Sequence, residues 1–178
     1  MRRLLLVGAA VVATMGGCAT TGPAPTAGPA SPFNPTDVAW LQLVVPMTEN
    51  ALSAARLAPS RAASPAVRKA ADSVSGAQEG LLVRLKAARD RAGLPAADVH
   101  SGHRMPGMVT AADLVALRTG SGAEFDQRLI ALLRAHAAQL VVLAKGEQTS
   151  GADAETKRLA GEVGAEGAQQ EKELANAA

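Results

Sequence analysis

The sequence predicts an all-α protein: a four-helix bundle built from two helical hairpins, with a short extra helix in the connection between them. Three observations support this prediction. The chain has no Tyr, one Trp and two Phe among its 178 residues and is rich in strong helix formers, which argues against a sheet protein. Apolar residues recur at steps of three and four along four long segments. The two pairs of segments can also be overlaid on each other.

The first 32 residues are expected to lie outside the bundle. Two arginines precede an apolar run too short to cross a bilayer, and two glycines then lead into Cys18, the single cysteine. Residues 1–17 are interpreted as a signal peptide. The small residues before Cys18 resemble a bacterial lipobox, which implies that lipid attached to Cys18 anchors the protein to the bacterial cell membrane, outside the cytoplasm. The alternative is a secreted protein with one free thiol. Residues 18–32, rich in Pro, Gly, Ala and Thr, are interpreted as a tether.

Charge and composition exclude nucleic-acid binding. Once Arg2 and Arg3 leave with the signal peptide, the remaining basic residues equal the 16 acidic residues in number, so the mature chain is formally neutral. A nucleic-acid interface needs a basic patch, and single strands also need aromatic side chains on which bases stack. The chain offers neither.

The first hairpin can be placed from local signals. Residues 37–58 form an amphipathic helix, which Thr36 is expected to cap. Ser64-Pro65 is a helix start, an N-cap residue followed by Pro at the first turn, and the second helix runs to about residue 91. Gly93 ends it. One folded domain is expected over residues 33–178, with halves of about 33–93 and 110–178.

The second half follows a loop over residues 94–109. Thr110 and Asp113 form a capping box that opens a short helix ending at Gly120. Two longer helices are expected over residues 123–148 and 153–174. The last of these contains three glycines, each costing about 1 kcal/mol relative to Ala, so its order must come from packing against its neighbours.

The two hairpins overlay without a gap at a shift of 89 positions. Asp37 then meets Asp126, Met47 meets His136, and Ser64 meets Asp153. Apolar positions match apolar positions and caps match caps, which indicates a divergent internal duplication. Two like hairpins that each bury one stripe give a bundle with approximate two-fold symmetry, in which equivalent positions on the first and third helices approach each other at the centre.

Two groups of residues are candidates for chemistry. The first is the pair Met47 and His136, equivalent under the repeat and both on the buried side of their helices. The second is the loop segment that contains His100, His103, Met105 and Met108. Thioether and imidazole groups together suit Cu(I) better than magnesium or calcium.

Four segments support a resemblance to a known family, the domain of unknown function 305. They are Phe33–Trp40, Pro46–Ala51, Met105–Met108 and Gly122–Asp126, in this order and spacing. The resemblance implies a ferritin-like helical protein of the kind found among exported bacterial proteins. Members carry a His-His pair in the first helix of each half, and some have been connected with copper binding.

This chain departs from the family at those pairs. It has Met47 and Thr48 at the first and His136 and Ala137 at the second, so that only His136 can be carried over, while Met105–Met108 is intact. Two interpretations remain open. The bundle holds copper in a degenerate site formed by His136 and Met47, completed by the loop, or it is a metal-free structural or interaction module whose ancestral site has decayed. In the second case, His136 and the methionines are core residues and the loop histidines are solvated.

No enzymatic activity is expected. A di-iron bundle needs a Glu three residues before a His, and none of the three histidines has one. The chain also lacks a phosphate-binding P-loop and a nucleophile elbow.

Overall fold

The computed structural model describes residues 31–100 and 102–177. In this part of the chain all regular secondary structure is helical, and there are no strands. The proposed signal peptide and Cys18 lie outside the described residues, as does the tether except for its last two positions. Residues from Ser31 onward form one compact unit.

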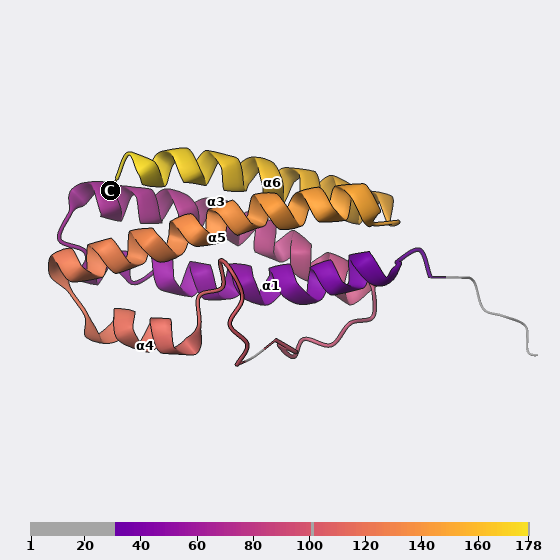
Figure 1. Cartoon of the computed structure of the whole chain (residues 1–178), viewed down its shortest axis with the longest axis horizontal. Helices are drawn as coiled ribbons and strands as arrows, with labels where there is room; N and C mark the ends of the chain where they lie inside the picture. The colour runs from indigo at the N-terminus through magenta and orange to yellow at the C-terminus, as the bar shows by residue number, and fades with distance from the viewer. Residues whose placement is uncertain (1–30, 101, 178) are drawn as a thin grey trace, which may run out of the picture. The chain divides into compact units, whose positions relative to one another are not determined.

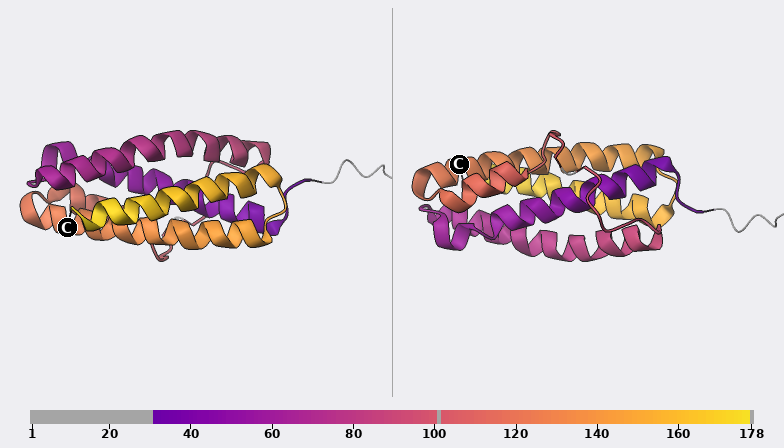
Figure 2. Two further views of the ribbon diagram at one scale, coloured as in Figure 1. Left: turned by 90° about the horizontal axis from the view of Figure 1, so that it is seen from above. Right: turned by 90° about the horizontal axis from the view of Figure 1, so that it is seen from below.

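Four long helices form the predicted bundle (Figure 1). Helices α1 (Pro35–Ala55) and α3 (Pro65–Arg91) make the first hairpin, and α5 (Gly122–Ser150) and α6 (Ala154–Ala175) make the second. Each long helix packs on two others, α1 on α3 and α5, and α6 on α5 and α3, as the views from above and below show (Figure 2). The predicted fold class is therefore confirmed. By length and composition α5 could cross a bilayer, but its apolar stripe packs on α1 and α6, as expected of a core helix.

Two short helices complete the fold. The predicted extra helix is α4 (Ala111–Thr119), opened by the capping box of Thr110 and Asp113. The sequence did not predict the other, α2 (Ala58–Arg61), which forms one turn between α1 and α3.

One predicted cap was wrong. The N-cap of α1 is Asn34, whose side chain accepts hydrogen bonds from the backbone N–H groups of Thr36 and Asp37 at 2.8 and 3.0 Å. Asp37 completes a capping box by accepting from the Asn34 N–H at 2.6 Å. The reason is Pro35: a proline is favoured at the first helical position, which makes the residue before it the cap. Ser64-Pro65 follows the same rule at α3, as predicted.

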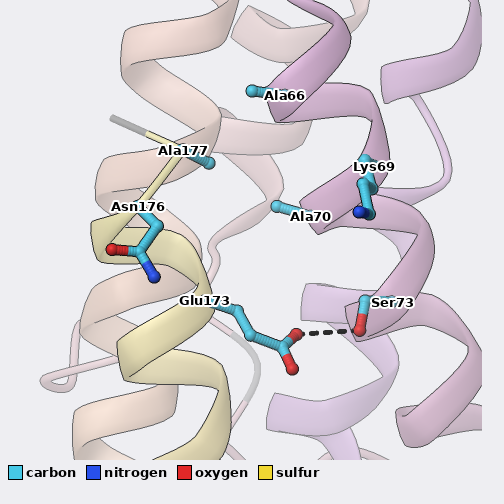
Figure 3. Close-up of a pocket in the computed structure, with 7 residues that line it drawn as sticks. All are labelled: Ala66, Lys69, Ala70, Ser73, Glu173, Asn176 and Ala177. Carbon is cyan, nitrogen blue, oxygen red and sulfur yellow. Dashed lines mark hydrogen bonds between the residues drawn. The ribbon is translucent and has the colours of Figure 1, made fainter.

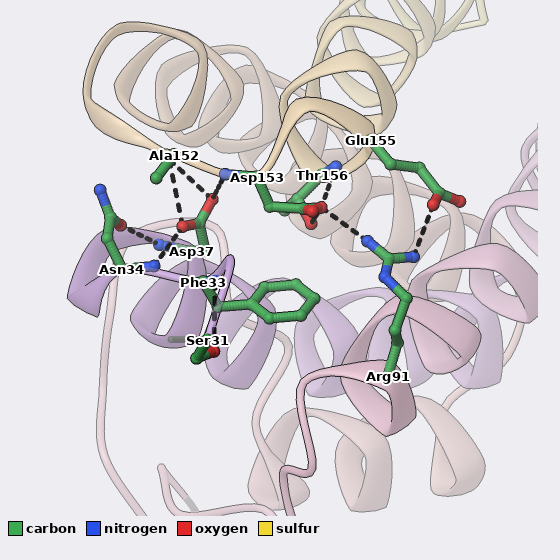
Figure 4. A network of polar contacts seen from close by, with 9 residues as sticks. All are labelled: Ser31, Phe33, Asn34, Asp37, Arg91, Ala152, Asp153, Glu155 and Thr156. Atoms are coloured by element: carbon green, nitrogen blue, oxygen red, sulfur yellow. Dashed lines mark hydrogen bonds and ion pairs between the residues drawn. The ribbon is translucent and has the colours of Figure 1, made fainter. Parts of the chain in front are cut away.

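The repeat is visible in a pair of crossed contacts. Asp37 of α1 accepts hydrogen bonds from the backbone N–H groups of residues 152–153, at the start of α6, at 3.1 Å (Figure 4). Asp126 of α5 accepts from residues 63–64, at the start of α3, at 3.1 and 2.8 Å. A shift of 89 positions converts one set of contacts into the other. Each half thus caps the second helix of the other half, as an approximate two-fold axis requires.

The core is divided into two apolar clusters with a polar layer between them. One cluster gathers the C-terminal half of α1, the N-terminal halves of α3 and α5, and the end of α6; the other gathers the opposite halves. Buried polar side chains lie between the clusters along each long helix. These are Thr48, Gln78, His136 and Gln170. Gln78 donates a hydrogen bond from its amide to Gln170 at 3.2 Å across the α3–α6 contact.

The three glycines of the last helix have a packing role. A Cβ atom at Gly164 would lie 2.9 Å from the Ala144 Cβ, and one at Gly167 would lie 2.8 Å from the Ala137 carbonyl oxygen. A Cβ at Gly161 would meet the Gln148 side chain. These glycines therefore let α6 approach α5 more closely than any side chain would permit, which explains why a helix with poor intrinsic propensity is ordered.

Candidate functional site

His136 lies on α5 in the polar layer and is completely buried. Neither ring nitrogen meets strict hydrogen-bond geometry, but one of them faces the backbone of Gly107, so at least one nitrogen has no polar partner. Burial lowers the pKa of the imidazole from 6.5 to about 4, and the interaction with the Gly107 backbone acts in the opposite direction. The ring is therefore neutral at physiological pH, with one nitrogen lone pair free to bind a ligand.

The Met105–Met108 loop reaches this part of the bundle. Gly107 has φ of +71°, and a Cβ there would lie 2.4 Å from the Gln139 Cβ and 2.7 Å from the Ala135 carbonyl oxygen. The loop backbone is thus pressed directly onto α5, on the turn that carries His136. Only glycine fits this position, for its conformation and for its size. Met108 and the residue after it are buried.

Met47 is also completely buried, on α1, and lies outside both apolar clusters. Its neighbour Thr48 donates its hydroxyl hydrogen to the Val44 carbonyl oxygen at 2.8 Å. The hydroxyl is therefore engaged within its own helix. Of the two side chains at the first family pair, the Met47 thioether is the one left as a candidate ligand.

His100 and His103, in the loop, lie nearer to the surface than His136. The ring centroids of His100 and His103 are 6.2 Å apart, with 57° between the ring planes. Both line a cavity of about 340 Å³ together with Met108 and, from α1, Asn50. The part-buried Met105 does not line it. Among the described residues, no three His, Cys, Asp or Glu side chains come close enough together to bind a metal ion by themselves.

Residues 37–178 match a protein family described as a domain of unknown function, DUF305. The chain belongs to the DUF305 family. Its fold is similar to that of a DUF305 fragment from Deinococcus radiodurans, with a TM-score of 0.73 and 22% identity, covering 82% of this chain and 97% of that one. A DUF305 protein from Streptomyces coelicolor is similar with a TM-score of 0.68 and 21% identity, covering 79% and 90%. No curated protein matches the chain.

In this DUF305 chain, the donor types at these buried positions are those that a soft cation accepts. His136 provides a neutral imidazole with at least one free nitrogen, and Met47 provides a buried thioether. Met108 follows the residue that packs onto the His136 turn. Cu(I) accepts imidazole and thioether ligands, whereas magnesium and calcium require oxygen.

Sequence reasoning missed a second buried titratable group in this DUF305 bundle, Glu147. The side chain is buried, and its carboxyl group lies against the Asp37 carboxylate, to which it donates a hydrogen bond when protonated. Burial, followed by the proximity of Asp37, raises the pKa of Glu147 to about 8. Burial also tends to raise the pKa of Asp37, but its contact with Glu147 and its three backbone N–H donors outweigh this and lower it. A glutamate in the last turns of a polar-faced helix carries no sequence signal for burial.

A further hollow, of about 400 Å³, separates the start of α3 from the end of α6 (Figure 3). The hydroxyl of Ser73 donates to the Glu173 carboxylate across it at 2.8 Å. A shift of 89 positions relates this pair to the ion pair between Glu162 and Arg84. The hollow contains no histidine or sulfur ligand, and its polar contact belongs to the symmetric framework of the bundle.

Proposed function

We propose that this protein is an exported lipoprotein that is anchored to the membrane through Cys18 and holds or passes Cu(I) inside its bundle. His136 and Met47 form the interior ligand pair, with Met108 or Met105 supplied by the loop. One observation carries the metal part of this proposal: the His136 imidazole is fully buried, yet the Gly107 backbone is the only polar group that approaches it, so at least one ring nitrogen is left without a partner. A buried polar group without a partner is destabilising, and its retention is explained by a ligand.

The chemistry of the interior supports binding rather than catalysis. The imidazole is neutral, which is the state that binds metal, and thioether sulfur is neutral at any pH. Such a ligand set adds no negative charge and therefore suits a monovalent soft cation. None of these residues forms a nucleophile and base pair of the kind that acyl or phosphoryl transfer needs.

Export and anchoring are supported by the N-terminal sequence. A basic start, a short apolar run and small residues before Cys18 are typical of a lipoprotein leader. The similar Streptomyces coelicolor protein is named as a secreted protein. Two acyl chains on Cys18 would hold the mature protein firmly on a membrane surface, because each buried methylene contributes about 0.8 kcal/mol.

The alternative is a metal-free structural or interaction lipoprotein. It is favoured by the replacement of three family histidines and by the engaged hydroxyl of Thr48, which cannot substitute for a lost imidazole without leaving its carbonyl partner. In this case His136 is a core residue whose ring interacts with the Gly107 backbone, and its remaining unpartnered nitrogen is tolerated.

Copper titration distinguishes the two functions. The full chain, purified in detergent, is titrated with Cu(I) under reducing conditions against a chromophoric chelator. We expect one tightly bound ion in the wild type, and at least a roughly tenfold loss of affinity when Met47→Leu and His136→Leu are combined. Gln78→Leu is the matched control, because it removes a buried polar group of the same layer that is a poor ligand for Cu(I). Unchanged affinity in the double variant would eliminate the copper site.

The anchor is tested separately. Cells fed a labelled fatty acid should incorporate the label into the wild-type protein but not into Cys18→Ser, whose helical circular dichroism should be unchanged. Equal labelling of the two proteins would contradict lipidation at this residue.

A further inference from the structure

We propose that the cavity around His100 and His103 is an outer receiving site, from which a soft metal ion passes to His136 and Met47 in the interior. This inference rests on the proposed function and adds a route to it. The cavity wall carries two imidazoles and the Met108 thioether, and all three groups are ligands for a soft ion. The His103 side chain is exposed and His100 is half-buried, so ions in solution can reach both.

The loop backbone brings the two rings together. The His103 N–H donates to the His100 carbonyl oxygen at 3.0 Å, which closes a tight turn. Gly102 has φ of +83°, a conformation that turns of this kind reserve for glycine. The ring centroids consequently lie 6.2 Å apart. Both histidines therefore line the same cavity.

Two short connections join the outer cavity to the interior ligands. Met108 lies in the cavity wall, and its neighbour Gly107 is packed against the α5 turn of His136. Asn50 of α1 also lies in the wall, and it is three residues from Met47 on the same helix. Side chains three positions apart on a helix have Cβ atoms about 5–6 Å apart. The cavity wall is therefore one loop residue from the segment that packs on the His136 turn, and one helix turn from Met47.

The interior ligands cannot be reached directly from solvent, because His136 and Met47 have no exposed surface. The loop segment around Gly107 packs on the α5 turn that carries His136 and covers that turn. Transfer is then a ligand exchange, in which bonds from the ion to the outer imidazoles break as bonds to His136 and Met47 form. Only coordinate bonds are exchanged, so the ion keeps its oxidation state.

Loading kinetics test the route. Full-length protein in detergent is mixed with Cu(I) in a stopped-flow instrument, and the loading rate and the equilibrium affinity are measured for each variant. His100→Gln combined with His103→Gln should slow loading about tenfold and change the affinity less than about threefold, since it removes only the entry site. Ala112→Ser, which alters the same cavity without changing its charge or removing a soft ligand, is the control. Loading at the wild-type rate would overturn the route.

The proposed function fails in a different way. If the wild type binds no Cu(I), the proposed function and the route fall together. If it binds one ion and the His100 and His103 variant loads at the wild-type rate, the route alone is wrong. A combined loss of rate and affinity in that variant would also overturn the inference, since it would make the outer histidines part of the final site.

Two glycines of the same loop test whether the segment around Gly107 restricts access to the interior ligands. Gly107→Ala forces a Cβ into α5, whereas Gly102→Ala places one in open space at a similar positive φ. We expect Gly107→Ala to raise the rate of Cu(I) release about tenfold and Gly102→Ala to leave it within about threefold of the wild type. Equal release rates in the two variants would show that the loop is not the cover.

Discussion

At the scale of single residues, the imidazole of His136 is held neutral by its surroundings. Its folded pKa of about 4 lies below the 6.5 of an exposed histidine, so between these values the unfolded chain binds more protons than the folded one. Stability from this residue is therefore complete above pH 6.5 and falls as the pH drops towards 4.

This fall can be measured by urea unfolding at pH 7 and pH 4.5. We expect His136 to account for about 2–3 kcal/mol of the loss between these values. His136→Gln should remove that part of the pH dependence, whereas His103→Gln, at an exposed position, should leave it intact. An unchanged pH dependence in His136→Gln would contradict the neutral, buried ring.

Glu147 has the opposite pH dependence. Its folded pKa of about 8 lies above the ordinary 4.5, so between these values the folded chain binds more protons, and stability falls as the pH rises through this window. Glu147→Gln should therefore be more stable than the wild type by roughly 2 kcal/mol at pH 9, with a smaller difference at pH 5. The exposed Glu171→Gln serves as the control. Equal stabilisation by Glu147→Gln at both pH values would exclude ionisation as the cause.

At the scale of elements, replacing a glycine by alanine is expected to change stability in opposite directions in α6 and in α3. A Cβ at Gly167 of α6 would meet the Ala137 carbonyl oxygen at 2.8 Å, whereas a Cβ at Gly80 of α3 meets nothing within 4 Å. Gly167→Ala should therefore destabilise the protein by about 1–3 kcal/mol through overpacking. Gly80→Ala should stabilise it by about 0.5–1 kcal/mol through helix propensity.

Thermal and chemical unfolding of the two variants measure this contrast. Stabilisation by both alanines would show that α6 can move away from α5 at no cost. The close α5–α6 contact would then not be what orders the last helix.

At the scale of the whole molecule, the two carboxylates that cross between the halves are the clearest mark of the duplication. Asp37 and Asp126 lie near opposite ends of the bundle, and each caps the start of a helix in the other half. Removing either one leaves part-buried backbone N–H groups at a helix start without their acceptor. Asp37→Ala and Asp126→Ala should each cost about 2 kcal/mol, and the double variant should lose the sum, because the sites share no partners.

Chemical denaturation of the two single variants and the double variant checks this expectation. Asp98→Ala, in the exposed loop, is the control. If the double variant loses much less stability than the sum of the two single variants, the two caps between the halves do not act independently. Such a result would also weaken the interpretation of the fold as a duplication.

Much of the fold could be predicted because its signals are local. Ser64-Pro65 marks the start of α3, and the capping box of Thr110 and Asp113 marks the start of α4. The shift of 89 positions needed only the order of apolar and capping residues. Asn34-Pro35 carried the same start signal as Ser64-Pro65, so the misplaced cap at Thr36 could have been avoided. The single turn of α2 had no such signal.

Taken alone, the sequence determined the helices, most of their ends, the duplication and the residue types available for a soft-metal site. Those features depend on neighbours along one chain segment, which the spacing of residues records. Only the tertiary structure decided that Gly107 packs on α5, that the His136 ring is fully buried with at least one nitrogen unpartnered, and that the Glu147 carboxyl group lies against Asp37. Burial and pKa depend on what distant helices bring to a side chain, and no local pattern encodes that.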